Sequence, residues 1–221
     1  MGYQARGWSV EPIVWKPFLA GLVASLVHHR DFRLVFLSRF FFQMGIATVQ
    51  GFLQYFVSDC LVTDLPPTVA VSVVMLPLLV LSPISAALAP RDAPRRVVYA
   101  AAAVMVWACL CLASLRSFLA VMAVCGVFGI AYGPFMSVEF AMVIAVLPDP
   151  KTAARDISLW HTALVLPQIM ASPIAGMLRD ALQPVGNDLG VVCLGYKVVY
   201  VVCIGYLLLG VLATRLIRSI D

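Results

Sequence analysis

Long apolar runs separated by short charged or proline-rich breaks make up most of the chain. A helix needs about 20 mostly apolar residues to cross the hydrocarbon core of a bilayer, and runs of this kind recur along the chain. We therefore predict an all-α membrane protein with six transmembrane helices and little chain outside the lipid. The predicted spans cover residues at about 34–57, 69–89, 97–115, 118–147, 157–178 and 197–214.

The composition agrees with this pattern and excludes other classes of protein. Of the 221 residues, 62% are hydrophobic and 12% are charged, and the mean hydropathy is +0.99. A soluble domain carries about 25% charged residues. An ordinary water-soluble enzyme and a disordered chain are therefore both excluded.

Residues 1–33 are predicted to form a cytosolic lead-in, and residues 215–221 a cytosolic tail. Apolar residues between Trp15 and Val27 recur at helical spacing, which predicts an amphipathic helix on the membrane surface. The sequence HHRD at 28–31 stands where a signal peptide would have its small-residue cleavage site, so we expect no cleaved signal in this segment.

Basic residues fall mainly on one side of the predicted spans, which predicts that both termini lie in the cytosol. In a membrane protein the placement of Lys and Arg carries more meaning than the net charge, here +4, so we expect no nucleic-acid partner. The cytosolic set is Arg6, Lys16, Arg30, Arg33, Arg91, Arg95, Arg96, Lys151, Arg155, Arg215 and Arg218, against Arg116, Arg179 and Lys197 on the other side.

The second and fifth predicted spans contain similar sequences. LPLLVLSPISAAL at 76–88 aligns with LPQIMASPIAGML at 166–178, and both prolines match. A weaker match joins Gly45 in the first span to Gly129 in the fourth. Chance similarity in a biased composition is the alternative, but the matches keep their order along two three-helix units. Because three is an odd number, the second unit is inverted, which is typical of secondary transporters.

Proline and glycine residues inside the spans predict local departures from straight, independent helices. A proline removes one backbone hydrogen bond and kinks a transmembrane helix, and glycines allow two helices to approach closely. The predicted kinks lie at Pro77, Pro83, Pro134, Pro167 and Pro173, and the predicted close contacts at Gly126, Gly129 and Gly133.

The first span carries a polar stripe made of Arg39, Gln43, Gln50 and Gln54. At about 100° per residue these side chains share one face of the helix, which is expected to face protein or water rather than lipid. Arg39 is close enough to the cytosolic end to act instead as a surface anchor.

Glu139 is the one acidic residue well inside a predicted span. It lies at a depth of about 13 Å from the cytosolic end of the fourth span, against about 9 Å for Arg39 in the first, so the two are candidates for an ion pair. A buried carboxylate is costly unless it is paired or protonated. Glu139 is therefore either a structural partner of Arg39 or a group that couples protons to transport.

The fifth span begins at Asp156, which we predict to cap the helix N-terminus. His161 and Gln168 follow inside the same span, and a lone histidine there is more often a packing residue than a proton relay. All three remain candidates for proton coupling or gating.

The motifs of membrane enzymes and of metal or cofactor sites are missing from the predicted spans. Neither a G-x-S nucleophile motif nor an H-E-x-x-H metal motif occurs in them, so we expect no catalysis, no metal and no cofactor. The cysteines form no C-x-x-C pair and are predicted to be packing residues. They are Cys60, Cys109, Cys111, Cys125, Cys193 and Cys203.

Several motifs together resemble the C-terminal six-helix half of a major facilitator superfamily transporter. DFR at 31–33, RF at 39–40, Gly45 and Gln50 resemble the start of that family's seventh helix. Segments resembling its tenth and eleventh helices are YG at 132–133, VEFA at 138–141, ARD at 154–156, LWH at 159–161 and LPQ at 166–168. Within the superfamily the chain is most similar to sugar–proton symporters of the sucrose and glycoside-pentoside-hexuronide type.

This resemblance, over residues 15–214, implies half of an alternating-access transporter that moves a small polar solute, with a sugar and a proton as one case. The implied binding residues are those of the polar stripe together with Glu139. The family's G-x-L-x-D-R-x-G-R-R loop motif is reduced here to AALAPRDAPRR at 86–96. A second six-helix half or a second copy is the implied partner. The alternative is a truncated, non-transporting fragment or interaction subunit.

Overall fold

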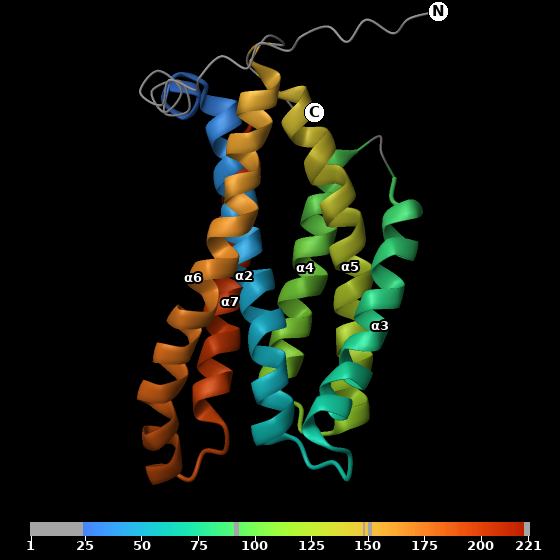
Figure 1. Ribbon diagram of the computed structural model, residues 1–221, viewed down its shortest axis with the longest axis vertical. Helices are drawn as coiled ribbons and strands as arrows, with labels where there is room; N and C mark the ends of the chain where they lie inside the picture. Colours follow the sequence, from blue (N-terminus) through green and yellow to red (C-terminus); the bar gives the residue numbers. More distant parts are fainter. Residues whose placement is uncertain (1–23, 91–92, 148, 150–151, 219–221) are drawn as a thin grey trace, which may run out of the picture.

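A computed structural model describes residues 24–90, 93–147, 149 and 152–218. These residues form an all-α bundle of six long helices, α2 to α7, that run alternately up and down (Figure 1). Each helix is long and apolar enough to cross a membrane, so the protein is an integral, multi-pass membrane protein. Their bounds are Arg30–Cys60, Pro67–Ala87, Pro94–Ser114, Phe118–Ala145, Ala153–Asp188 and Leu194–Arg215.

Local sequence signals explain where several helices begin and end. Proline stands at the start of α3 and of α4, where its missing N–H costs no hydrogen bond. The stop after α6 is a Schellman turn: Gly190 adopts a φ of +68°, its N–H bonds to Asn187 O at 3.2 Å, and the Val191 N–H bonds to Gly186 O at 2.8 Å.

The end of α6 corrects the expected loop between Arg179 and Tyr196, because the helix continues to Asp188. The charged residues at 179–180 do not stop the helix; the chain turns only where Gly190 allows a positive φ. At about 1.5 Å per residue, the 36 residues of α6 extend about 54 Å, which is longer than the hydrocarbon core of about 30 Å. The helix is therefore longer than a crossing of the hydrocarbon core requires.

The six helices pack in a pattern that links the first three to the last three. α3 lies along α5, and α6 lies along α2. α4 packs against α5 and α7, and α7 packs against α2 and α6. α3 and α6 are the least buried helices of the bundle.

Two ends of the bundle are defined by these helices. The "basic end" holds the beginnings of α2, α4 and α6 and the ends of α3, α5 and α7; the "opposite end" holds their other termini.

The predicted lead-in helix between Trp15 and Val27 lies almost wholly outside the described residues. Within the predicted lead-in of 1–33, residues 24–28 are helical and α2 already begins at Arg30.

Candidate functional site: a buried ion pair between α2, α5 and α6

Two buried charged side chains from different helices, Arg39 and Glu139, form an ion pair. The Arg39 Nη1 of α2 donates to the Glu139 Oε2 of α5 at 2.7 Å. Their side chains are 3% and 4% exposed, so the pair lies inside protein rather than in lipid. Arg39 therefore points into the bundle instead of acting as a surface anchor.

A third helix completes this site. The guanidinium of Arg39 lies over the ring of Trp160 in α6, 3.6 Å from its centroid, and Phe140 packs against the same indole. A cation held over an indole face is attracted by the negative face of the ring. The site therefore joins α2, α5 and α6 at one level of the bundle.

Three polar atoms at this site have no hydrogen-bond partner among the described residues. They are Arg39 Nε, Glu139 Oε1 and the indole Nε1 of Trp160. A buried polar atom without a partner costs about 1–3 kcal/mol, and more for a charged group. The ion pair is thus incomplete as a hydrogen-bonded unit, and it retains capacity to bind another polar group.

The polar stripe of α2 divides along its length. One turn beyond Arg39, the buried Gln43 donates to the sulfur of Met136 in α5 at 3.3 Å. Gln50 is half-buried and Gln54 is exposed. Gln54 lines a cavity of about 470 Å³ together with Thr68 and Ser72 of α3. The stripe therefore starts beside the ion pair and ends in an open groove between α2 and α3.

Asp156 is not the N-cap that the sequence predicted. α6 begins at Ala153 with Thr152 as the N-cap residue, and Asp156 is fully buried one turn inside the helix. It accepts hydrogen bonds from Ser25 Oγ and Thr152 Oγ1, both at 2.8 Å. Burial with these donors makes Asp156 an anchor between α6 and the chain before α2.

The other polar residues of α6 face outward. His161 and Gln168 are exposed, and the ring of His161 lies 5.2 Å from that of Trp160. Ser172, about three turns beyond His161, shares this face and contacts α2 at Gly51, whose added Cβ would lie 3.0 Å from Ser172 Oγ. The polar faces of α2 and α6 are therefore adjacent.

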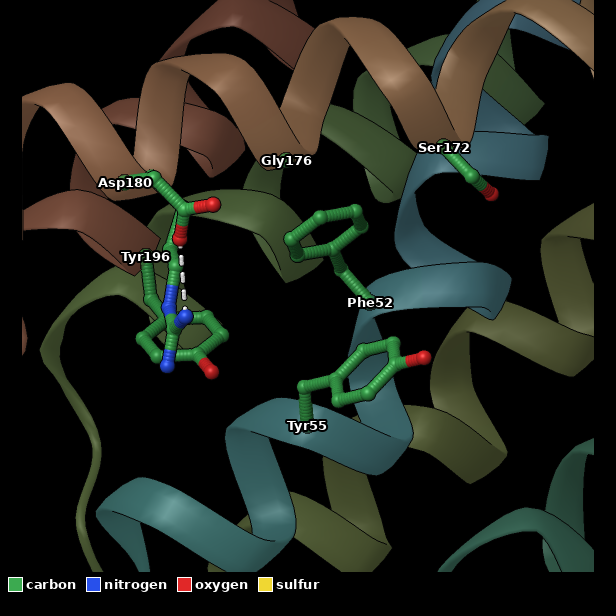
Figure 2. A pocket seen from close by; sticks show the side chains of 7 residues that line it. Phe52, Tyr55, Ser172, Gly176, Asp180 and Tyr196 are labelled. Atoms are coloured by element: carbon green, nitrogen blue, oxygen red, sulfur yellow. Dashed lines mark hydrogen bonds and ion pairs between the residues drawn. The ribbon is translucent and has the colours of Figure 1, made fainter.

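Sequence analysis did not identify a cavity at the opposite end, between α2, α6 and α7 (Figure 2). Its volume is about 240 Å³. Arg179 binds two carboxylates there, Asp59 at 2.6 Å and Asp180 at 2.8 Å, and the Tyr196 hydroxyl donates to Asp59. The remaining lining residues are Phe52, Tyr55, Ser172 and Gly176. The adjacent opposite charges at 179–180 are the sequence signal for this site, although the hydropathy pattern predicts a loop there and the structure places them inside α6.

The prediction that all six cysteines are packing residues is wrong for two of them. Cys60 at the end of α2 and Cys193 just before α7 form a disulfide, whereas Cys109, Cys111, Cys125 and Cys203 are free. The two bridged residues are 133 positions apart. No local spacing rule identifies such a pair, because only the fold brings the two helix termini together.

The glycine prediction is confirmed at the contact between α3 and α5. A Cβ at Gly129 would lie 2.7 Å from Leu78 Cα, and one at Gly133 would lie 2.0 Å from Ser82 O. Gly126 similarly contacts Pro77. The five predicted kink prolines lie inside α3, α5 and α6, which continue as helices through them.

Comparison with models of protein families and with curated protein sequences finds no match to this chain. The fold class and the membrane-spanning helices therefore rest on the structure itself.

Proposed function

We propose that this chain is one six-helix half of an alternating-access secondary transporter of the major facilitator type. It moves a small polar solute, with a sugar carried together with a proton as the favoured case. The observation that carries this proposal is the buried Arg39–Glu139 pair with its three unpartnered polar atoms.

The helix contacts support an inverted repeat of α2–α4 and α5–α7. If α2 corresponds to α5, α3 to α6 and α4 to α7, the contact of α3 with α5 corresponds to that of α6 with α2. The contact of α4 with α5 likewise corresponds to that of α7 with α2. Such reciprocal contacts are expected when two inverted units interlock.

One pair of aligned residues supports the same repeat at atomic detail. Ser82 of α3 and Ser172 of α6 occupy the same place in the two matching segments. Ser82 contacts a glycine of α5, Gly133, and Ser172 contacts a glycine of α2, Gly51. Each serine therefore packs against the first helix of the other unit.

The ion pair joins the first helices of the two proposed units, α2 and α5. Protonation of Glu139 would remove one charge and leave Arg39 without its carboxylate, which changes what holds α2 to α5. A polar solute offering an acceptor to Arg39 and a donor to Glu139 would instead compensate both groups. Such a pair links proton or solute binding to helix position, since a buried charge must remain compensated.

The remaining predicted residues provide a surface for the solute. Gln43, Gln50 and Gln54 follow the ion pair along α2, while His161 and Gln168 line the neighbouring face of α6. Polar side chains facing hydrocarbon are costly. We propose that a second six-helix half, or a second copy of the chain, covers this surface and forms the other wall of the cavity.

The proposed orientation places the basic end in the cytosol. Among the described residues, Arg30, Arg33, Arg95, Arg96, Arg155, Arg215 and Arg218 lie at that end, against Arg116, Arg179 and Lys197 at the other. The Cys60–Cys193 disulfide lies at the opposite end. Disulfides persist in oxidising compartments, so its position supports the same orientation.

The test is uptake into proteoliposomes containing the purified chain. Radiolabelled sucrose, glucose, xylose and glucuronate would be supplied at neutral pH, with protein-free liposomes as the background. The proposal expects saturable uptake of at least one solute that is lost in the Glu139→Gln variant and retained in Asp64→Asn, an exposed acid in the loop after α2. No uptake of any solute above background would exclude transport by paired copies of this chain and would favour the alternative of a non-transporting subunit.

A further inference from the structure

A third cavity, at the basic end, is separate from the ion pair and from the polar stripe. It lies where the beginning of α2, the end of α5 and the end of α7 meet, and its volume is about 500 Å³. Small-molecule sites usually measure about 300–1,000 Å³, so this cavity is large enough to hold a ligand. We call it the basic-end cavity.

Four basic side chains line this cavity from two sides. His28 and His29 come from the residues just before α2, Arg30 is the first residue of α2, and Arg218 comes from the segment after α7. Arg218 is placed by its neighbour, because Arg95 of α4 donates a hydrogen bond to Ile217 O. Residues far apart in the sequence therefore converge on one opening.

The two arginines are free to bind an anion. Both are exposed, and neither makes an ion pair or hydrogen bond with the described part of the chain. One acid, Asp31, also lines the cavity, but it is already engaged in an interaction of its own. The formal charge of the lining is thus positive even with both histidines neutral.

The other wall of the cavity is apolar. Phe32, Ala145, Val146 and Leu147 line it, and Ala145 is the last residue of α5. A basic rim beside an apolar wall, at the end of transmembrane helices, matches the junction between a lipid headgroup and its acyl chains. Free inorganic phosphate would use the basic rim alone.

We propose that the basic-end cavity binds the phosphate headgroup of an anionic phospholipid in the adjoining leaflet. Arg30 and Arg218 contact the phosphate, the histidines border the headgroup, and the wall formed by α5 contacts the beginning of the acyl chains. Basic pockets between transmembrane helices recognise anionic lipids in this way. The site does not depend on whether the chain transports a solute.

The test is competition between lipids on the purified full chain in detergent, measured by native mass spectrometry. Equimolar phosphatidylglycerol and phosphatidylcholine of identical acyl chains are added at low ionic strength. We expect preferential retention of phosphatidylglycerol, and we expect Arg30→Gln/Arg218→Gln to reduce that preference about tenfold. The matched control is Arg33→Gln/Arg96→Gln, which removes two exposed arginines from the same end without touching the cavity.

Each result of this experiment decides the proposal. Equal loss in the two double variants would reduce the effect to general surface charge and overturn the site. If inorganic phosphate at 20 mM displaces the lipid completely, the apolar wall contributes nothing and the lipid assignment is wrong. Should the cavity variant fail to fold, the wild-type chain still tests it: the preference must fall as NaCl rises from about 50 to about 500 mM. A wild-type chain without preference contradicts the proposal.

Discussion

The contact of α3 with α5 and the contact of α6 with α2 are equivalent in the proposed repeat, yet their chemistry differs. The first is a close approach of backbones, with Gly129 and Gly133 against Leu78 and Ser82. The second carries Trp160 over Arg39 and, at the opposite end, the Arg179–Asp59 ion pair. Similar helix packing thus supports a tight contact between backbones in one place and a contact of charged and aromatic side chains beside a cavity in the other.

The two helix contacts are therefore expected to have different roles in folding and in transport. The α3–α5 contact has little room to change, because Gly133 already lies against backbone atoms. The α2–α6 side contains the unpartnered atoms of the ion pair and the cavity of Figure 2. We expect substitutions in the α3–α5 contact to change folding stability alone. Substitutions in the α2–α6 contact are expected to change transport and folding stability to different extents.

The largest expected effect comes from removing one member of the buried ion pair. Arg39→Leu or Glu139→Leu alone leaves an uncompensated buried charge and should destabilise the protein by about 3–5 kcal/mol. The double variant Arg39→Leu/Glu139→Leu should lose less stability than either single variant, because it leaves no unpaired buried charge. Thermal unfolding in detergent measures all three. Single losses that simply add up in the double variant would show that the two groups are not energetically coupled.

The next effect compares the two helix contacts directly. Gly133→Ala places a Cβ 2.0 Å from a backbone oxygen and should cost about 3 kcal/mol, because α3 and α5 must separate. The matched Gly51→Ala places its Cβ 3.0 Å from the Ser172 hydroxyl, a side-chain atom that can move, and should cost under about 1 kcal/mol. Equal losses of stability for Gly133→Ala and Gly51→Ala in the same unfolding assay would show that the two helix contacts are equally tight.

A moderate effect is expected from the disulfide at the opposite end. Cys60→Ser/Cys193→Ser should lower stability by about 2 kcal/mol, because the bridge restricts the unfolded chain. The Cys111→Ser variant, which changes a free thiol, is the control. Unfolding with and without dithiothreitol, together with peptide mapping under non-reducing conditions, measures the effect. Alkylation of both Cys60 and Cys193 in the untreated, unfolded protein would contradict the bridge.

The smallest effect concerns the ion pair near the disulfide. Arg179 and Asp59 are 36% and 39% exposed, so water already screens their attraction. Asp59→Asn should therefore cost no more than about 1 kcal/mol, well below the cost of changing Glu139. A loss as large as that of Glu139→Leu in the same unfolding assay would show that the opposite end, too, depends on charge compensation.

The sequence predicts the six helices well because span length and hydropathy are local properties of the chain. It also places Arg39 and Glu139 at similar depths, since depth follows from position along a helix. The sequence pattern does not predict features that depend on tertiary contacts. The stop of α6 depends on Gly190, the burial of Asp156 depends on Ser25, and the Cys60–Cys193 bridge depends on helices that are distant in sequence.

The surroundings of the polar stripe likewise depend on how the helices pack. Helical periodicity correctly groups Arg39, Gln43, Gln50 and Gln54 on one face of α2. It does not reveal that Gln43 is buried against Met136 while Gln54 opens toward α3. The neighbours of a face are set by helix packing, which a single-helix pattern does not contain.

The central claim, that the Arg39–Glu139 pair couples proton and solute movement, is tested most directly by proton-driven uptake. Proteoliposomes containing the wild-type chain, Glu139→Gln or the control Asp64→Asn would receive labelled sucrose, or the best solute of the panel, with and without acidification of the outside. We predict that acidification accelerates uptake by the wild type and the control but leaves Glu139→Gln unchanged. A Glu139→Gln variant that responds to acidification like the wild type would contradict the claim.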